Sequence, residues 1–148
     1  MEKKKLTGWL ILLIIWIGIY PFIGWRGLMT AIENNYRPLM EDYPSLRLSL
    51  TVAELLMWAS IAAWLYAAIV LYRREPGSLG RAKTALVLGV LPRIASGWSI
   101  PLLGGLPEAV SKIIIRRGLP GMLYALMFTG AWYLYLARSR KVKDLYGG

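Results

Sequence analysis

The sequence predicts an all-α, polytopic membrane protein: a four-helix transmembrane bundle with a short interfacial helix on its outer side. Three observations predict this class: four long apolar stretches, cations at their ends, and aromatic residues that run directly into a cationic C-terminal cluster. Hydrophobic residues make up 57% of the 148 residues, more than is usual for a soluble domain. We expect a single transmembrane domain, 1–148, with spans at about 6–27, 48–72, 82–103 and 118–137.

The first span carries no charge from Leu6 to Trp25, a stretch that would form about 30 Å of helix and match the hydrocarbon core. The preceding cations, Lys3 to Lys5, are also typical of a signal peptide. The apolar run is too long for one, however, and no small-residue cleavage site follows it. We therefore favour a retained first helix.

The two middle spans each contain a charged residue. Glu54 interrupts the second span, and Pro92 and Arg93 interrupt the third, whereas the fourth is free of charge. The connection between the middle spans is short and contains Pro76 and Gly77, so we expect these two helices to be antiparallel neighbours.

Lys and Arg are distributed unequally between the two sides of these spans, with eleven on one side and six on the other. The cytoplasmic side of a membrane protein carries the excess of cations, so both termini are predicted to be cytoplasmic. The larger group comprises Lys3, Lys4, Lys5, Arg73, Arg74, Arg81, Lys83, Arg138, Arg140, Lys141 and Lys143. The smaller group comprises Arg26, Arg37, Arg47, Lys112, Arg116 and Arg117.

The outer side is predicted to hold two irregular segments. Residues 28–47 contain several turn-forming residues and are expected to form a loop. Residues 107–117 are compatible with a helix lying in the membrane interface and with a loop packed on the bundle; Gly118–Gly121 would be a turn before the last span. Lys112, Arg116 and Arg117 are candidate contacts for lipid headgroups.

The composition excludes several classes of function. The chain contains neither Cys nor His, which removes thiol nucleophiles, imidazole catalysis and the common transition-metal ligands. We therefore expect no cofactor, no metal site and no enzymatic activity. The net charge of +10 comes from cations at the ends of apolar runs, which favours the lipid bilayer and its anionic lipids over nucleic acid as partners.

Short motifs occur along the whole chain, formed by Gly8, Trp9, Leu10, Pro21, Tyr43, Pro44, Trp132, Tyr135, Ser139, Lys141, Val142 and Lys143. These motifs resemble those of DUF2569, a family of small bacterial membrane proteins of unknown function. Lys141 stands where the family more often has Arg. The resemblance implies a four-helix protein of the bacterial inner membrane and implies no activity.

Glu54 and Arg93 are the charged residues predicted to lie within spans, where an unpaired charge costs about 2.5–3.5 kcal/mol. Helical phase places Arg93 on a face of small and polar residues that should pack inward. We hypothesise an ion pair between them that either fixes helix register or forms a binding or proton-handling site. In the remaining alternative the two side chains do not meet.

Aromatic residues near the span ends are predicted to anchor the protein at the membrane interfaces. They are Trp9, Trp16, Tyr20, Trp25, Tyr66, Tyr72, Trp132 and Tyr135.

Three classes of function remain open from the sequence. The leading prediction is an accessory, scaffold or regulatory subunit, whose partner would be a larger membrane protein or a second copy of the chain. The second is a small, oligomeric transporter or channel that uses the Glu54 and Arg93 region. The third is a membrane protein that binds an anionic lipid.

Overall fold

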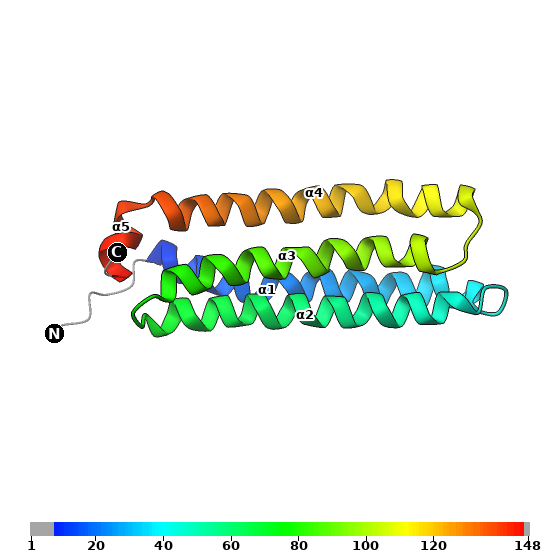
Figure 1. Cartoon of the computed structure of the whole chain (residues 1–148), viewed down its shortest axis with the longest axis horizontal. Coiled ribbons are helices and arrows are strands. Elements are labelled where there is room, and N and C mark those ends of the chain that lie inside the picture. Colours follow the sequence, from blue (N-terminus) through cyan, green and yellow to red (C-terminus); the bar gives the residue numbers. More distant parts are fainter. Residues whose placement is uncertain (1–7, 147–148) are drawn as a thin grey trace.

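The computed structural model describes residues 8–146, and nearly all of them are helical. Four long helices run the length of an elongated bundle: α1 (Gly8–Ala31), α2 (Ser45–Arg73), α3 (Ser78–Leu103) and α4 (Glu108–Arg138) (Figure 1). A short helix, α5 (Arg140–Tyr146), lies at one end. The all-α prediction is therefore confirmed. Lys3, Lys4 and Lys5, which were predicted to lie on the cytoplasmic side, fall outside the described residues.

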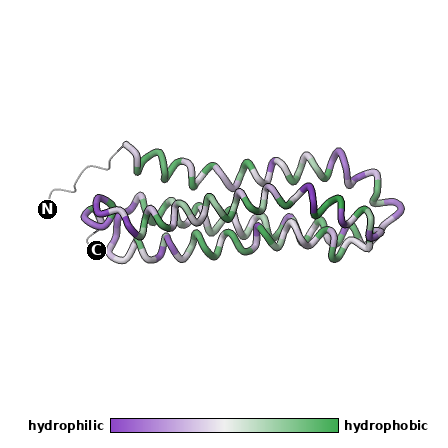
Figure 2. Tube along the Cα trace, turned by 90° about the horizontal axis from the view of Figure 1, so that it is seen from above, coloured by the Kyte–Doolittle hydropathy of each residue, from purple (hydrophilic) through white to green (hydrophobic). Residues whose placement is uncertain are grey.

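Three helical segments are long and apolar enough to cross a membrane, namely 8–40, 45–73 and 78–103. They indicate a membrane protein, as the sequence predicted. Hydrophobic residues extend along the helices, and many hydrophilic ones lie at the two ends (Figure 2). α4 has 31 residues but is not among the three segments. Its first half carries three cations and two glycines, and its second half is rich in aromatic residues, so the fourth span stays a prediction.

The bundle has two distinct ends (Figure 1). At the end that we call the terminal end, α1 begins, α2 connects to α3 and α5 lies across the helices. The opposite end, which we call the loop end, holds the α1–α2 and α3–α4 connections. Successive long helices therefore run in opposite directions.

α2 and α3 form the central antiparallel pair, as the short connection between them predicted. Three side chains of buried residues bond across it to backbone carbonyls: Ser60 Oγ to Gly89 O at 2.6 Å, Ser96 Oγ to Ala53 O at 2.9 Å and Trp64 Nε1 to Leu86 O at 3.2 Å. A Cβ at Gly89 would overlap the Trp64 indole, so Gly is required for this approach. These contacts fix the register of the pair.

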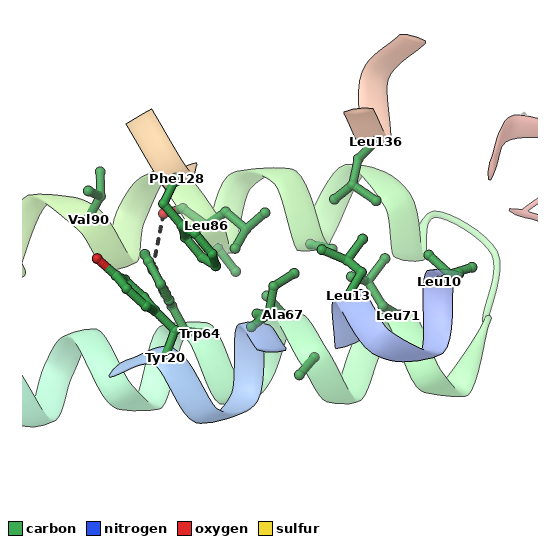
Figure 3. Close-up of a cluster of buried hydrophobic side chains, with 14 of the residues drawn as sticks. Leu10, Leu13, Tyr20, Trp64, Ala67, Leu71, Leu86, Val90, Phe128 and Leu136 are labelled. Carbon is green, nitrogen blue, oxygen red and sulfur yellow. Dashed lines mark hydrogen bonds between the residues drawn. The ribbon is translucent and has the colours of Figure 1, made fainter. Parts of the chain in front are cut away.

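Buried hydrophobic side chains form two clusters. The larger extends from the middle of the bundle to the terminal end and joins all the long helices through residues such as Leu13, Trp64, Leu86 and Leu136 (Figure 3). The smaller lies near the loop end and contains Leu46, Leu50, Ala53 and Ile100.

The predicted loop 28–47 is wrong over most of its length. α1 continues to Ala31 and is followed by a π-helical turn, η1 (Ile32–Tyr36), and a 3₁₀ turn, η2 (Arg37–Met40). Leu28, Ile32 and Tyr36 recur at helical spacing and pack against the smaller cluster. Because of this packing, the chain stays helical through η1 and η2 although the segment contains turn-forming residues.

The predicted interfacial helix at 107–117 is also wrong as a separate element, because those residues from Glu108 onward form the first part of α4. The expected turn at Gly118–Gly121 lies inside the same helix. Pro120 removes only one backbone hydrogen bond, and Ile114 packs on the smaller cluster, so the helix continues. Arg117 consequently lies about 13 Å along α4 from its first residue.

Candidate functional site

Arg93 lies within the bundle, on the small and polar face of α3. Gly89 and Ser96 on its side of the helix are buried. Leu88 and Leu91 on the opposite side are exposed. The prediction that the Arg93 face packs inward is therefore confirmed.

The Arg93 guanidinium has few acceptors within reach. Its Cζ atom lies 5.0 Å from the centroid of the Tyr20 ring, and Nη1 lies 3.8 Å from Met57 Sδ. A Cβ at Gly24 would clash with the guanidinium, so α1 passes directly beside it. An arginine has five N–H donors, and among the described residues this one meets the sulfur of Met57, a weak acceptor, and the phenol of Tyr20, but no carboxylate.

The predicted ion pair between Glu54 and Arg93 is not formed. Within residues 8–146, the ion pairs with an N–O distance of 4.0 Å or less use Glu75 or Glu108 as their carboxylate. Met57, one helical turn further along α2, is the residue that meets Arg93, and Glu54 is rotated from it by about 60° around the helix axis. The two charges therefore lie in separate surroundings, and Glu54 is half-buried.

A cavity of about 620 Å³ adjoins Arg93, between α1, η1, η2, α2, α3 and α4. Glycines from three helices line it; they are Gly24, Gly27, Gly97, Gly118 and Gly121. Arg93 and Met122 occupy the space beside Gly24 and Gly97, whereas a Cβ at Gly27 or Gly121 would meet no atom within 4 Å. The remaining wall is mostly apolar, formed by Leu28, Ala31, Leu39, Met57, Ile100, Val110, Ile113, Ile114 and Met122. The volume is typical of a small-molecule site.

The cavity is strongly positive. Arg93 and Arg117 both line it, whereas no Asp or Glu is among its described lining residues. Asn35 and Tyr36 are polar groups at the same wall. Because the surrounding walls have a low dielectric constant, the two cations produce a field that attracts an anion.

The predicted lipid-contacting cations separate into three environments. Lys112 pairs with Glu108 at 2.6 Å, and both side chains are exposed. Arg116 and Arg117 are both exposed, but only Arg117 is among the cavity-lining residues. Consecutive positions on a helix point about 100° apart, which explains why only one of these two arginines reaches the cavity wall.

An aromatic cluster, formed by Tyr20, Trp64, Tyr124 and Phe128, lies beside Arg93. Figure 3 shows three of its members, Tyr20, Trp64 and Phe128. Tyr20 stacks on Phe128 with centroids 4.2 Å apart and on Trp64 at 5.1 Å. Tyr20 is 4% exposed, and its hydroxyl has no hydrogen-bond partner within the described chain. This hydroxyl points along α3 toward Val90 and away from the Leu10 end of the bundle (Figure 3).

The sequence interpretation missed this cluster. It assigned Tyr20 to a membrane interface, whereas the structure buries that residue, and it gave no role to Trp64 or Phe128. One signal was present: Tyr124, Phe128 and Trp132 recur at intervals of four, which places them on one side of a helix.

The residues that carry the family resemblance do not line the cavity. Those near the C-terminus instead build the terminal end: the Val142 N–H donates to Ser139 Oγ at 3.4 Å, and Val142 is buried. The Tyr146 hydroxyl, just beyond them, donates to Leu71 O at 2.5 Å and fastens α5 to α2. The closing motif thus has a structural role in this chain.

No protein-family model matches the chain, and comparisons with curated proteins and with solved structures find no match. The resemblance to DUF2569 therefore stays a prediction. Within residues 8–146 there is also no group of three or more Asp, Glu, His or Cys side chains that could hold a metal ion.

Proposed function

We propose that this protein binds an anionic amphiphile, a lipid with a negatively charged headgroup, in the cavity beside Arg93. One observation carries the proposal: a guanidinium that pairs with no carboxylate among the described residues adjoins a cavity of about 620 Å³ that is lined by a second arginine and by no described Asp or Glu. This is the lipid-binding alternative that the sequence left open, with its site moved from the predicted headgroup surface into the bundle.

The energetic argument concerns the charge on Arg93. A cation at the centre of a membrane costs about 2.5–3.5 kcal/mol, and the cation–π contact with Tyr20 returns about 0.5–2 kcal/mol of this. An anionic headgroup would supply the missing countercharge, and guanidinium groups match phosphate and carboxylate oxygens in geometry. The apolar wall would at the same time contact the hydrocarbon chain.

The arrangement of the helices favours entry from the side. α4 packs chiefly against α3 and makes few contacts with α1 away from the aromatic cluster. A lipid chain could therefore extend from the cavity between α1 and α4 into the bilayer. The cavity lies towards the loop end, which the cation count assigns to the outer leaflet.

A pair of neighbouring substitutions on α4 tests the proposal. Arg117→Gln removes a cation from the cavity wall, whereas Arg116→Gln removes an equal charge from outside it. We expect native mass spectrometry to show an anionic lipid retained by the wild type and by Arg116→Gln and largely lost from Arg117→Gln. Equal loss from both variants would indicate a nonspecific headgroup surface and would refute the proposal.

Filling the cavity provides an independent test. A Cβ at Gly121 or at Gly130 would meet no atom within 4 Å, but only Gly121 lines the cavity. Gly121→Leu should therefore expel the lipid, because its side chain starts in open space at the cavity wall, and Gly130→Leu is the matched control. Retention of the lipid by Gly121→Leu would place the binding site elsewhere.

The same spectra bear on the other hypotheses. A second polypeptide that copurifies at fixed stoichiometry would support the accessory-subunit hypothesis, and transport stays a prediction that requires a flux measurement. We further propose four spans in a bacterial inner membrane with both termini cytoplasmic, because α1 begins and α5 ends at the same end of the bundle. The chain contains no Cys, so single-Cys variants labelled from either side would test this topology directly.

A further inference from the structure

We infer that the headgroup bound between Arg93 and Arg117 is a phosphomonoester, so that the preferred ligand is a long-chain lipid ending in a phosphate dianion. This inference rests on the proposed function and specifies the ligand of the same site. It follows from the charge of the cavity, from its hydrogen-bond donors and from the shape of its wall.

The charge of the cavity matches a dianion. The two arginines contribute two positive charges, and none of the described lining residues is acidic. A phosphodiester carries one negative charge and would leave one arginine without a countercharge. A phosphomonoester carries about −1.5 to −2 at neutral pH and compensates both.

The hydrogen-bond donors at the site also match a phosphomonoester better than a phosphodiester. A phosphomonoester offers three strong acceptor oxygens, one more than the two non-ester oxygens of a diester. The Arg93 and Arg117 guanidiniums, which both line the cavity, can each present two parallel N–H groups to such oxygens.

The wall of the cavity indicates that the phosphate belongs to a lipid. Val110, Ile113 and Ile114 extend from the level of Arg117 towards the loop end of α4, and Leu28 and Leu39 face the same space from α1 and η2. A free phosphate would make no use of these apolar side chains. An alkyl chain would contact them while its phosphate lies between the arginines.

The charged and titratable groups around the site make pH a specific probe of the ligand. They are Arg93 from α3, Arg117 from α4, Tyr36 from η1 and Tyr20 from α1, and none of these residue types ordinarily titrates between about pH 5 and pH 8. Glu54 of α2 does not line the cavity. The second ionisation of a phosphomonoester, with a pKa of about 6, falls within that range.

The experiment uses the full-length protein in nanodiscs of zwitterionic phosphatidylcholine. Phosphatidic acid, a phosphomonoester, and phosphatidylglycerol, a phosphodiester with the same acyl chains, are titrated in at about pH 5 and about pH 8. Bound lipid is counted by native mass spectrometry. Arg93→Gln, Arg117→Gln and the control Arg116→Gln are measured in parallel, so that the proposal remains testable if the Arg93 variant fails to fold.

We expect phosphatidic acid to bind at least about tenfold more tightly than phosphatidylglycerol at pH 8, a difference of about 1.4 kcal/mol. The preference should fall about tenfold at pH 5, where roughly a tenth of the monoester is a dianion. Arg93→Gln and Arg117→Gln should each remove most of the preference, and Arg116→Gln should retain it. Millimolar inorganic phosphate should not displace the lipid.

The outcomes separate the two proposals. Equal binding of both lipids at both pH values would refute the phosphomonoester inference and leave the proposed function intact. Failure of both lipids to bind would refute the proposed function itself. Displacement by inorganic phosphate would show that the site recognises the free anion, which would overturn the assignment of a lipid ligand.

Discussion

Replacing Arg93 by Met distinguishes a structural role for this residue from a ligand-binding role. A structural ion pair predicts that the substitution destabilises the protein, because it would leave a partner carboxylate unpaired. The observed surroundings predict the opposite sign. Arg93 contacts the Tyr20 ring and Met57 Sδ, and a Met side chain can occupy the same space without a charge.

The magnitude follows from two opposing contributions. Removing the cation from the membrane interior recovers about 2.5–3.5 kcal/mol, and losing the cation–π contact with Tyr20 costs about 0.5–2 kcal/mol. Arg93→Met should therefore increase the free energy of unfolding by roughly 0.5–3 kcal/mol when no anionic ligand is present. For a chain of this length the melting temperature should rise by roughly 2–10 °C.

The assay is thermal unfolding in a zwitterionic detergent, followed by tryptophan fluorescence. Arg116→Met is the control, because an exposed arginine outside the cavity should change stability by no more than about 0.5 kcal/mol. A loss of about 3–5 kcal/mol in Arg93→Met would be the signature of a broken buried ion pair and would refute the reasoning. The stabilised variant should also lose the bound lipid, as expected where function opposes stability.

Three further predictions concern the packing and the remaining charges. Gly89→Ala should destabilise the protein by about 1–3 kcal/mol in the same assay, because the added methyl overlaps the Trp64 indole; the control Gly130→Ala, which meets no atom, should not. Glu54→Gln and the Arg93 substitution should have additive effects in a double-mutant cycle, and a coupling energy above about 0.5 kcal/mol would show that the two charges interact. Burial raises the pKa of Tyr146 to about 12, so the neutral phenol stabilises the fold below pH 10 and this contribution disappears as the pH rises through 12. The stability difference between the wild type and Tyr146→Phe should therefore decrease above pH 10, and a difference independent of pH would contradict this.

The sequence predicted which faces of the helices are buried more successfully than where the helices end. Helical phase alone placed Arg93 on the inward face of α3, because the contrast between small and bulky side chains repeats at helical spacing. The connections were predicted poorly. The structure has η1 and η2 where a loop was expected, and α4 includes both the predicted interfacial segment and the expected turn at Pro120. Turn-forming residues favour a turn only through local backbone preference. The packing of Ile32, Tyr36 and Ile114 on the smaller cluster stabilises helical structure at these positions instead.

For the candidate site, too, the sequence predicted some features and not others. The sequence identified Arg93 as a charge that needs an explanation, since a cation within a span is costly, and it gave Arg117 as a candidate contact for lipid headgroups. It could not decide their partners, because a side-chain contact depends on the relative rotation and register of two helices. Those quantities are fixed by Gly89 against Trp64 and by the stacking of Tyr20 on Phe128.

The sequence by itself therefore determined that this is a helical protein with long apolar segments and an arginine on an inward-facing side of a helix, because composition and periodicity are properties of the chain alone. Only the tertiary structure decided that Arg93 meets Met57 and not Glu54, and that a cavity lined by glycines from three helices lies beside it. A cavity is the space that separate segments leave between them. Its existence depends on how those segments pack, which no single stretch of sequence specifies.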